Sequence, residues 1–222
     1  MTEKSRKEGE ENGKEGLGPI SRRDFAIGSV AVLGVTGGDA AAKTITRTTG
    51  KAASEAPAPQ RLPGPPASDS ARSIHLTVNK WKFEVKVEPE SALRDVLRDQ
   101  LGFLSVKDMC NGHGACGSCT VIVDGRPVLS CMTLAVECDG VTIETAEGVA
   151  TANPPLIEAY VLNHCMQCGY CTPGFVVTAK ALLDRNPKPT EQDIREALGG
   201  NICRCGTYPQ HILAVQEVTA GK

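Results

Sequence analysis

Ten cysteines stand out in this 222-residue sequence, because eight of them fall into two sets of four. Most of the first set lies in the string MCNGHGACGSC, and the second lies in QCGYC and CRC. Cysteine thiolates bind soft metal centres and can also pair as disulfides, so the spacing within each set must distinguish these uses. The first set comprises Cys110, Cys116, Cys119 and Cys131, and the second comprises Cys168, Cys171, Cys203 and Cys205.

The spacings favour iron–sulfur clusters over the two other uses of cysteine. A CRC pair and a CGSC pair are too closely spaced to make a useful disulfide framework. A four-thiolate zinc site commonly has two C-x2-C knuckles, whereas each set contains one. The first set approaches the C-x4-C-x2-C…C pattern of plant-type [2Fe–2S] proteins, with one extra residue between Cys110 and Cys116. We therefore expect one [2Fe–2S] cluster per set, with a zinc-stabilised interaction module as the alternative.

The residues around the two sets have simpler expected roles. Cys138 and Cys165 are predicted to be small buried side chains, although Cys165 lies close enough to Cys168 in the sequence to replace it as a ligand. His113 is predicted to be an exposed loop residue, because Rieske-type clusters need two histidines on one iron. His211 is assigned a packing or surface role. The first cysteine loop contains three glycines, which can adopt positive φ angles and so let the chain wrap a cluster: Gly112, Gly114 and Gly117.

The first cysteine set lies among patterns that predict an α+β domain. Apolar residues alternate over 73–87 with a break at Asn79 and Lys80, which predicts a hairpin. Leucines four residues apart then predict a helix that begins at Ser91 and ends at Gly102. The cysteine loop follows this helix. The remaining expected elements are a strand, turn and strand over 119–131, turning at Asp124 and Gly125, and a short strand within 140–148.

Helical patterns dominate from residue 152 onward. Thr190 and Asp193 have the spacing of a capping box, and two glycines follow the same helix. The second cysteine set is therefore predicted to lie in an all-helical domain over 151–222, after an α+β domain over 72–150. The helices are expected within 153–163, 173–186, 189–200 and 209–220.

The residues before 72 have the composition of an export signal and a tether. A charged segment, an apolar run and small residues follow one another within 1–42, and Arg22 and Arg23 form the arginine pair of twin-arginine signals. The apolar run is too short and glycine-rich to span a bilayer, so we expect no transmembrane segment in the mature chain. Residues 43–71 are rich in proline and alanine and are predicted to be a disordered linker. A net charge of −2 argues against a nucleic-acid partner.

From about residue 72 to its end, the sequence resembles the iron–sulfur subunit of the molybdenum hydroxylases, the xanthine dehydrogenase and aldehyde oxidoreductase family. The matching strings are CGSCTVIVDGRPVLSC, QCGYCTPGF, ALLDRNPKPTEQDIREALGGNICRC and GTYP. The resemblance implies a β-grasp ferredoxin domain with a [2Fe–2S] cluster on the first set, and a four-helix domain with another on the second. It also implies that Gln167 contacts the pterin of the molybdenum cofactor and that Cys205 is the ligand nearest to it.

The resemblance further implies that this chain passes electrons onward and contains no catalytic residue. Its expected partner is a large subunit that holds molybdopterin, of the cytosine dinucleotide kind, and oxidises an aldehyde or a nitrogen heterocycle. A cytochrome c or an FAD subunit is the expected electron acceptor. A twin-arginine signal implies export of the folded protein to the periplasm, so that both clusters would be built in the reducing cytoplasm. The alternative within electron transfer is a stand-alone periplasmic ferredoxin-like carrier.

Overall fold

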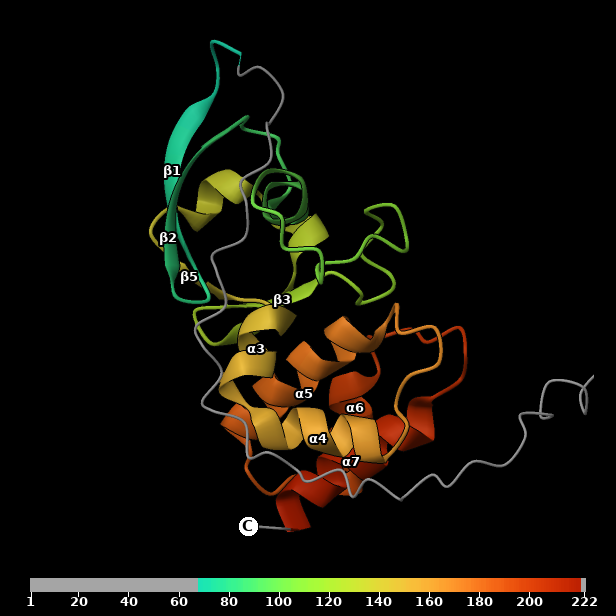
Figure 1. Cartoon of the computed structure of the whole chain (residues 1–222). Coiled ribbons are helices and arrows are strands. Elements are labelled where there is room, and N and C mark those ends of the chain that lie inside the picture. Colours follow the sequence, from blue (N-terminus) through green and yellow to red (C-terminus); the bar gives the residue numbers. More distant parts are fainter. Residues whose placement is uncertain (1–67, 221–222) are drawn as a thin grey trace, which may run out of the picture. The chain divides into compact units, whose positions relative to one another are not determined.

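Residues 68–220 are described by a computed structural model of the chain (Figure 1). The predicted signal segment over 1–42 and all but the last four residues of the predicted linker over 43–71 lie outside the described residues. None of the helices between residues 68 and 220 combines the length and the apolar character that a bilayer crossing needs.

The predicted N-terminal hairpin is confirmed. Strands β1 (Arg72–Val78) and β2 (Trp81–Val87) pair antiparallel, and Asn79 turns the chain with a φ of 59°. Asparagine tolerates this left-handed conformation better than most residues, which explains why the turn forms without glycine at its first position. Alternate β1 side chains are buried, as period-two alternation requires.

A five-stranded mixed sheet forms the first domain, in the order β2-β1-β5-β3-β4. The second predicted hairpin is confirmed as β3 (Thr120–Val123) and β4 (Arg126–Leu129), joined by Asp124 and Gly125, both with positive φ. The short predicted strand is β5 (Thr142–Glu144), which runs parallel to β1 and antiparallel to β3. Two short 3-10 turns, η3 (Ser130–Met132) and η4 (Ala135–Cys138), lie between β4 and β5.

The helix that packs on this sheet differs from its prediction at the start and in its winding. Ala92 caps it in place of Ser91, α2 (Leu93–Asp95) forms less than one turn, and the chain then widens into the π-helical η2 (Val96–Gln100). Leu101 N–H donates to the Val96 carbonyl over 3.0 Å, the five-residue spacing of that winding. The predicted leucines are all buried, because the wider turn still points them at the sheet: Leu93, Leu97 and Leu101.

The second domain is helical, as predicted. Its helices are α4 (Pro154–Leu162), α5 (Thr172–Arg185), α6 (Glu191–Leu198) and α7 (Tyr208–Ala220). The capping box at α6 is confirmed: Asp193 N–H donates to Thr190 Oγ1 over 3.2 Å, and Thr190 N–H donates to the Asp193 carboxylate over 2.8 Å. An additional helix, α3 (Ala146–Ala152), precedes α4; its seven residues are too few for a clear helical pattern in the sequence.

Each domain has its own apolar core, and β3 belongs to both. Val121 packs among the buried residues of the sheet domain, whereas its neighbour Ile122 packs with α5 and the other helices. Successive strand residues point to opposite faces, so a strand that is apolar on both faces fits this position between two cores. Figure 1 shows β3 at the end of the sheet domain that meets the helices.

Candidate metal centres

The first cysteine set gathers in the loop between η2 and β3 and in η3. Cys116 and Cys119 are buried, whereas Cys110 and Cys131 are partly exposed. Cys110 lies close to Cys116, and Cys131 lies close to Cys119, so that the thiols of each pair affect one another's pKa. The extra residue between Cys110 and Cys116 is accommodated without separating these sulfurs. The loop thus brings the four thiols predicted as ligands to one place beside the sheet.

Backbone amides point at the sulfurs of this loop. Burial acts to raise the pKa of Cys110, but hydrogen bonds from the Ala115 amide and the Cys116 thiol lower the pKa to about 7. For Cys131, burial and the neighbouring Cys119 raise the pKa to about 11. The loop therefore already stabilises one thiolate at neutral pH, and thiolate is the form that binds a metal.

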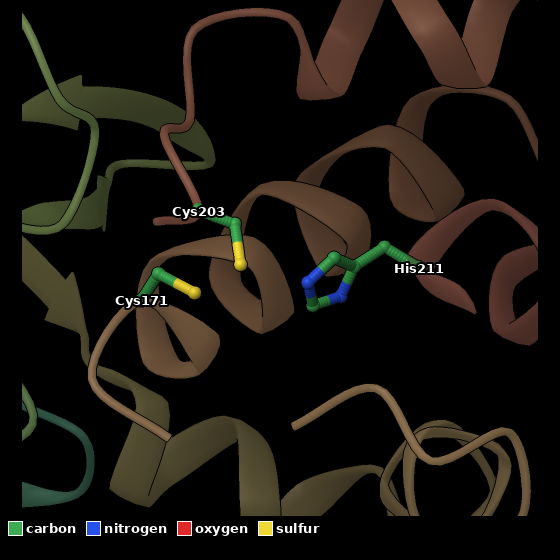
Figure 2. Close-up of side chains that lie close together, drawn as sticks. All are labelled: Cys171, Cys203 and His211. Atoms are coloured by element: carbon green, nitrogen blue, oxygen red, sulfur yellow. The ribbon is translucent and has the colours of Figure 1, made fainter. Parts of the chain in front are cut away.

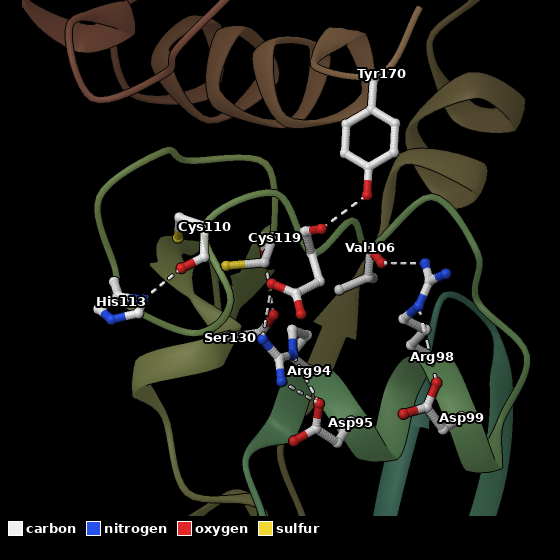
Figure 3. A network of polar contacts seen from close by, with 11 residues as sticks. Arg94, Asp95, Arg98, Asp99, Val106, Cys110, His113, Cys119, Ser130 and Tyr170 are labelled. Atoms are coloured by element: carbon white, nitrogen blue, oxygen red, sulfur yellow. Dashed lines mark hydrogen bonds and ion pairs between the residues drawn. The ribbon is translucent and has the colours of Figure 1, made fainter. Parts of the chain in front are cut away.

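A polar network holds the first loop in place (Figure 3). Arg94, on α2, forms ion pairs with Asp95 at 2.6 Å and Asp108 at 3.0 Å. The Asp108 carbonyl accepts a 2.8 Å hydrogen bond from the Tyr170 hydroxyl, which belongs to the second cysteine loop. Asp108 thus contacts both Arg94 of α2 and Tyr170 of the second cysteine loop. His113 is exposed, as predicted, and its ring approaches the Cys110 carbonyl within the loop.

The second cysteine set spans the start of α5 and the segment before α7. Cys171 and Cys203 are buried, Cys205 is partly exposed and Cys168 is exposed. The sulfurs of Cys171 and Cys203 lie within 4.8 Å of each other and of a ring nitrogen of His211 (Figure 2). Cys168 lies close enough to Cys205 for that thiol to lower its pKa. The set therefore consists of an inner pair and an outer pair of sulfurs.

Acidity differs sharply within the second set. Burial raises the pKa of Cys171 to about 12. Burial also opposes ionisation of Cys203, but the hydroxyl and amide of Thr207 donate hydrogen bonds that lower its pKa to about 7. At the surface, the Tyr170 amide and then Cys205 lower the pKa of Cys168. One sulfur of each pair is thus favoured as the thiolate before any metal binds.

His211 is fully buried, which agrees with the packing role predicted for it. Its ring stacks on Phe175 with centroids 3.9 Å apart, and its Nε2 lies 3.1 Å from Thr207 Oγ1. Burial lowers the pKa of His211 to about 4, so the ring is neutral at pH 7. Its contact with Thr207 was missed from the sequence. The helical spacing of His211 from Ala214 and Val215, both buried, is the signal that places it on the inner face of α7.

The two remaining cysteines are buried, as predicted. Burial raises the pKa of Cys165 to about 12, and its thiol donates a 3.2 Å hydrogen bond to the Gln210 carbonyl. Cys138 is also buried, and burial raises its pKa. Cys165 is thus already hydrogen-bonded to the backbone of α7, and both side chains are small buried thiols, as the sequence predicted.

The two cysteine loops touch directly. Ile202 N–H donates a 2.9 Å hydrogen bond to the Cys116 carbonyl, and the Asn201 side-chain amide donates to the Gly117 carbonyl over 3.1 Å. Gly117 has a φ of 70°, and a Cβ there would lie 2.6 Å from the Gly200 carbonyl oxygen. Glycine is therefore required at 117 both by the backbone conformation and by the close approach of the second loop. Cys116 and Cys203, one from each set, are thus separated by a single hydrogen bond and one residue.

The donor sets fit iron–sulfur clusters. All ten cysteines, which lie within the described residues, are free thiols, and each predicted set supplies four sulfurs with backbone amides directed at them. Amide hydrogen bonds to sulfur are a feature of such sites. Gln167, predicted to contact a pterin, is exposed beside Cys168.

Comparisons with known proteins agree with this chemistry. A family model described as "2Fe-2S iron-sulfur cluster binding domain" matches residues 70–153, and one described as "[2Fe-2S] binding domain" matches residues 145–216. The nicotinate dehydrogenase small FeS subunit of Eubacterium barkeri is 46% identical over 138 residues, covering 61% of this chain and 87% of that protein. The chain belongs to the iron–sulfur subunits of the molybdenum hydroxylases.

Two other similar proteins extend this likeness. The aldehyde oxidoreductase iron-sulfur-binding subunit PaoA of Escherichia coli K12 is 36% identical over 183 residues, covering 75% of each chain. The structure of quinoline 2-oxidoreductase from Pseudomonas putida 86 matches with a TM-score of 0.65 and 38% identity, over 69% of this chain and 96% of that chain. As a molybdenum hydroxylase iron–sulfur subunit, the chain is the electron-transfer component of an oxidoreductase, and the predicted order of a ferredoxin-like domain before a helical one is confirmed.

Proposed function

We propose that this chain relays electrons from a molybdenum centre on a large partner subunit, through both of its domains, to an external acceptor. The observation that carries the proposal is the contact between the two cysteine loops. The hydrogen bond from Ile202 to the Cys116 carbonyl places two four-cysteine sets side by side in one chain. A single-cluster carrier has no need of the second set or of the helical domain that positions it.

Each set has a defined role in this proposal. A [2Fe–2S] cluster, when bound, accepts and returns one electron at a time. The protein's part is to hold the sulfurs as thiolates, to direct amides at them and to exclude water from the inner positions. The proposed ligands are Cys110, Cys116, Cys119 and Cys131 in the first domain, and Cys168, Cys171, Cys203 and Cys205 in the second.

The outer pair of the second set is the proposed entry point for electrons. Cys168 is exposed, Cys205 is partly exposed, and Gln167 is exposed next to Cys168, so these residues are accessible to a partner. The proposed partner holds molybdopterin cytosine dinucleotide and acts on an aldehyde or a nitrogen heterocycle. Electrons then leave to a cytochrome c or an FAD subunit. The periplasm, reached through a twin-arginine signal, is the proposed location of the complex.

Iron content and electron paramagnetic resonance test the ligand assignment on the full-length matured chain. We expect about four irons per chain and two distinct signals on reduction, because each four-thiolate set holds one two-iron cluster. Cys110→Ser should abolish one signal and Cys203→Ser the other, each with loss of about two irons. A colourless protein with bound zinc, or one signal with about two irons, would overturn the proposal.

One of the two cysteines outside the proposed sets provides a matched control. Cys165→Ala lies only three residues before Cys168 but is not a proposed ligand, so it should keep both signals and the full iron content. Loss of the helical-domain signal in Cys165→Ala would show that the ligand set is wrong. Dye reduction by the purified complex, with aldehydes and nitrogen heterocycles tested separately, then identifies the substrate class.

A further inference from the structure

A chain of polar contacts leads from a proposed ligand to a buried histidine. Cys203 Sγ lies 3.2 Å from Thr207 Oγ1, and Thr207 Oγ1 lies 3.1 Å from His211 Nε2. The Thr207 amide also donates to the same sulfur over 3.4 Å. All three side chains are buried, so no bulk water competes for these contacts.

The histidine is fixed in position by its surroundings. Its ring is parallel to that of Phe175, with 3° between the planes, and it lies 5.4 Å from the ring of Tyr160. Within residues 68–220, its buried Nδ1 has no hydrogen-bond partner, and the hydrogen-bond contact of the ring is made by Nε2. A polar side chain held on the fully buried face of α7 through one nitrogen calls for a specific explanation.

We propose that His211 and Thr207 form a directional hydrogen-bond relay that raises the reduction potential of the helical-domain cluster: His211 Nε2–H donates to Thr207 Oγ1, and the Thr207 hydroxyl donates to Cys203 Sγ. This inference rests on the proposed function, because it requires Cys203 to be a cluster ligand. Both are positioning residues, since His211 acts only through Thr207 and neither binds iron.

The chemistry of the three groups determines the direction. A metal-bound thiolate only accepts hydrogen bonds, so the single hydroxyl proton of Thr207 must point at Cys203 if that contact is a hydrogen bond. The oxygen of Thr207 then has only lone pairs to offer His211, which must therefore carry its proton on Nε2. The hydrogen bond from His211 to Thr207 strengthens the one from Thr207 to Cys203, because each hydrogen bond in a chain polarises the next.

The direction has an electrostatic consequence that can be measured. Donors aimed at a ligand sulfur stabilise the extra negative charge of the reduced state, so removing them lowers the potential. The opposite arrangement, in which Thr207 donates to His211, predicts the opposite sign. Removing His211 would then free the hydroxyl to turn toward Cys203, and the potential would rise.

Redox titration of the full-length matured chain, followed by electron paramagnetic resonance, separates these outcomes. In Thr207→Val we expect the one-electron reduction constant of the helical-domain cluster to fall about tenfold, a shift of about −59 mV, while the Thr207 amide remains. In His211→Phe, which keeps an aromatic ring against Phe175, we expect a fall of about threefold. Thr207→Ser keeps the hydroxyl and should leave the potential near that of the wild type. The double variant should match Thr207→Val alone, because His211 acts through Thr207.

The first-domain cluster is the internal control, since its potential should stay constant in every variant. An unchanged or raised potential in His211→Phe would overturn the relay, and so would nitrogen-14 hyperfine coupling showing His211 bound directly to iron. If Thr207→Val does not mature, the comparison of His211→Phe with Thr207→Ser still decides the sign. A wild-type chain without a second signal contradicts the proposed function instead, so the two failures are distinguishable.

Discussion

At the scale of single residues, the backbones of the two domains approach so closely that some positions have no room for a side chain. Gly117 and Gly174 face each other across the two domains: a Cβ on Gly174 would lie 2.5 Å from the Gly117 carbonyl oxygen. A Cβ on Gly117 would in turn meet the Gly200 carbonyl oxygen. Neither neighbour can move like the end of a flexible side chain, because both are backbone atoms. The close approach of the two domains therefore depends on the absence of a Cβ at both of these glycines.

Gly117→Ala should destabilise the protein by roughly 3 kcal/mol or more, from a left-handed φ combined with a backbone clash. Urea denaturation of the matured chain measures this loss. Gly125→Ala is the matched control, because Gly125 has a φ of 79° but no atom of the described part of the chain lies within 4 Å of the added Cβ. It should cost only about 1 kcal/mol, from backbone strain alone. Equal losses in the two variants would mean that the close approach at Gly117 is unimportant.

At the scale of elements, the sequence predicted those parts whose causes are local. Asp124 and Gly125 specify a tight turn, and the capping box at α6 is encoded by two residues three apart. The π-helical turn of η2 was not predicted, since leucines four residues apart are compatible with either an α-helical or a π-helical turn. The burial of Ile122 against α5 was also missed, because it depends on contact between two domains.

Thr190→Ala tests the start of α6, which both the sequence and the structure place directly after Thr190. Losing this cap should cost about 1 kcal/mol, because the first-turn amide of Asp193 loses its acceptor. Hydrogen bonds from Thr190 lower the pKa of Asp193, so the reciprocal contact is fully formed at neutral pH. Hydrogen–deuterium exchange should accelerate in the first turn of α6 but not in α7. Thr190→Ser keeps the acceptor and should exchange like the wild type; faster exchange in that variant would argue against the capping explanation.

In the candidate site, as in the secondary structure, the sequence predicted local features but missed contacts between separate segments. The cysteine spacings predicted which sulfurs would gather, and the structure brings each set together. The Cys203–Thr207 contact was not predictable, because the chain between Cys203 and α7 is irregular and has no sequence period. The same holds for the hydrogen bond from Ile202 to Cys116, which joins segments far apart in the sequence.

At the scale of the whole molecule, the proposed export route makes a prediction about two chains at once. Unfolded thiols would be oxidised in the periplasm, so the proposal requires folding and cluster binding before export. The large partner, if it has no signal of its own, must then cross while bound to this chain. Both chains would therefore depend on one arginine pair.

Replacing Arg22 and Arg23 together by lysine should leave both subunits in the cytoplasm. Cell fractionation and immunoblotting of each subunit measure the distribution. The double variant Arg47→Lys and Arg61→Lys changes the same residue types outside the pair, so it should be exported normally. Export of the large subunit despite the Arg22 and Arg23 changes would show that it crosses independently.

The cysteines of the second set differ in burial, and this difference bears on the order of cluster insertion and subunit docking. Cys168 is at the surface, whereas Cys171 and Cys203 are enclosed by the helices. A donor protein that delivers iron must reach this set through the Cys168 side, the side proposed to face the large subunit. Maturation would then have to precede docking, and the finished partner would act as the cover that shields the newly inserted metal from oxygen and chelators.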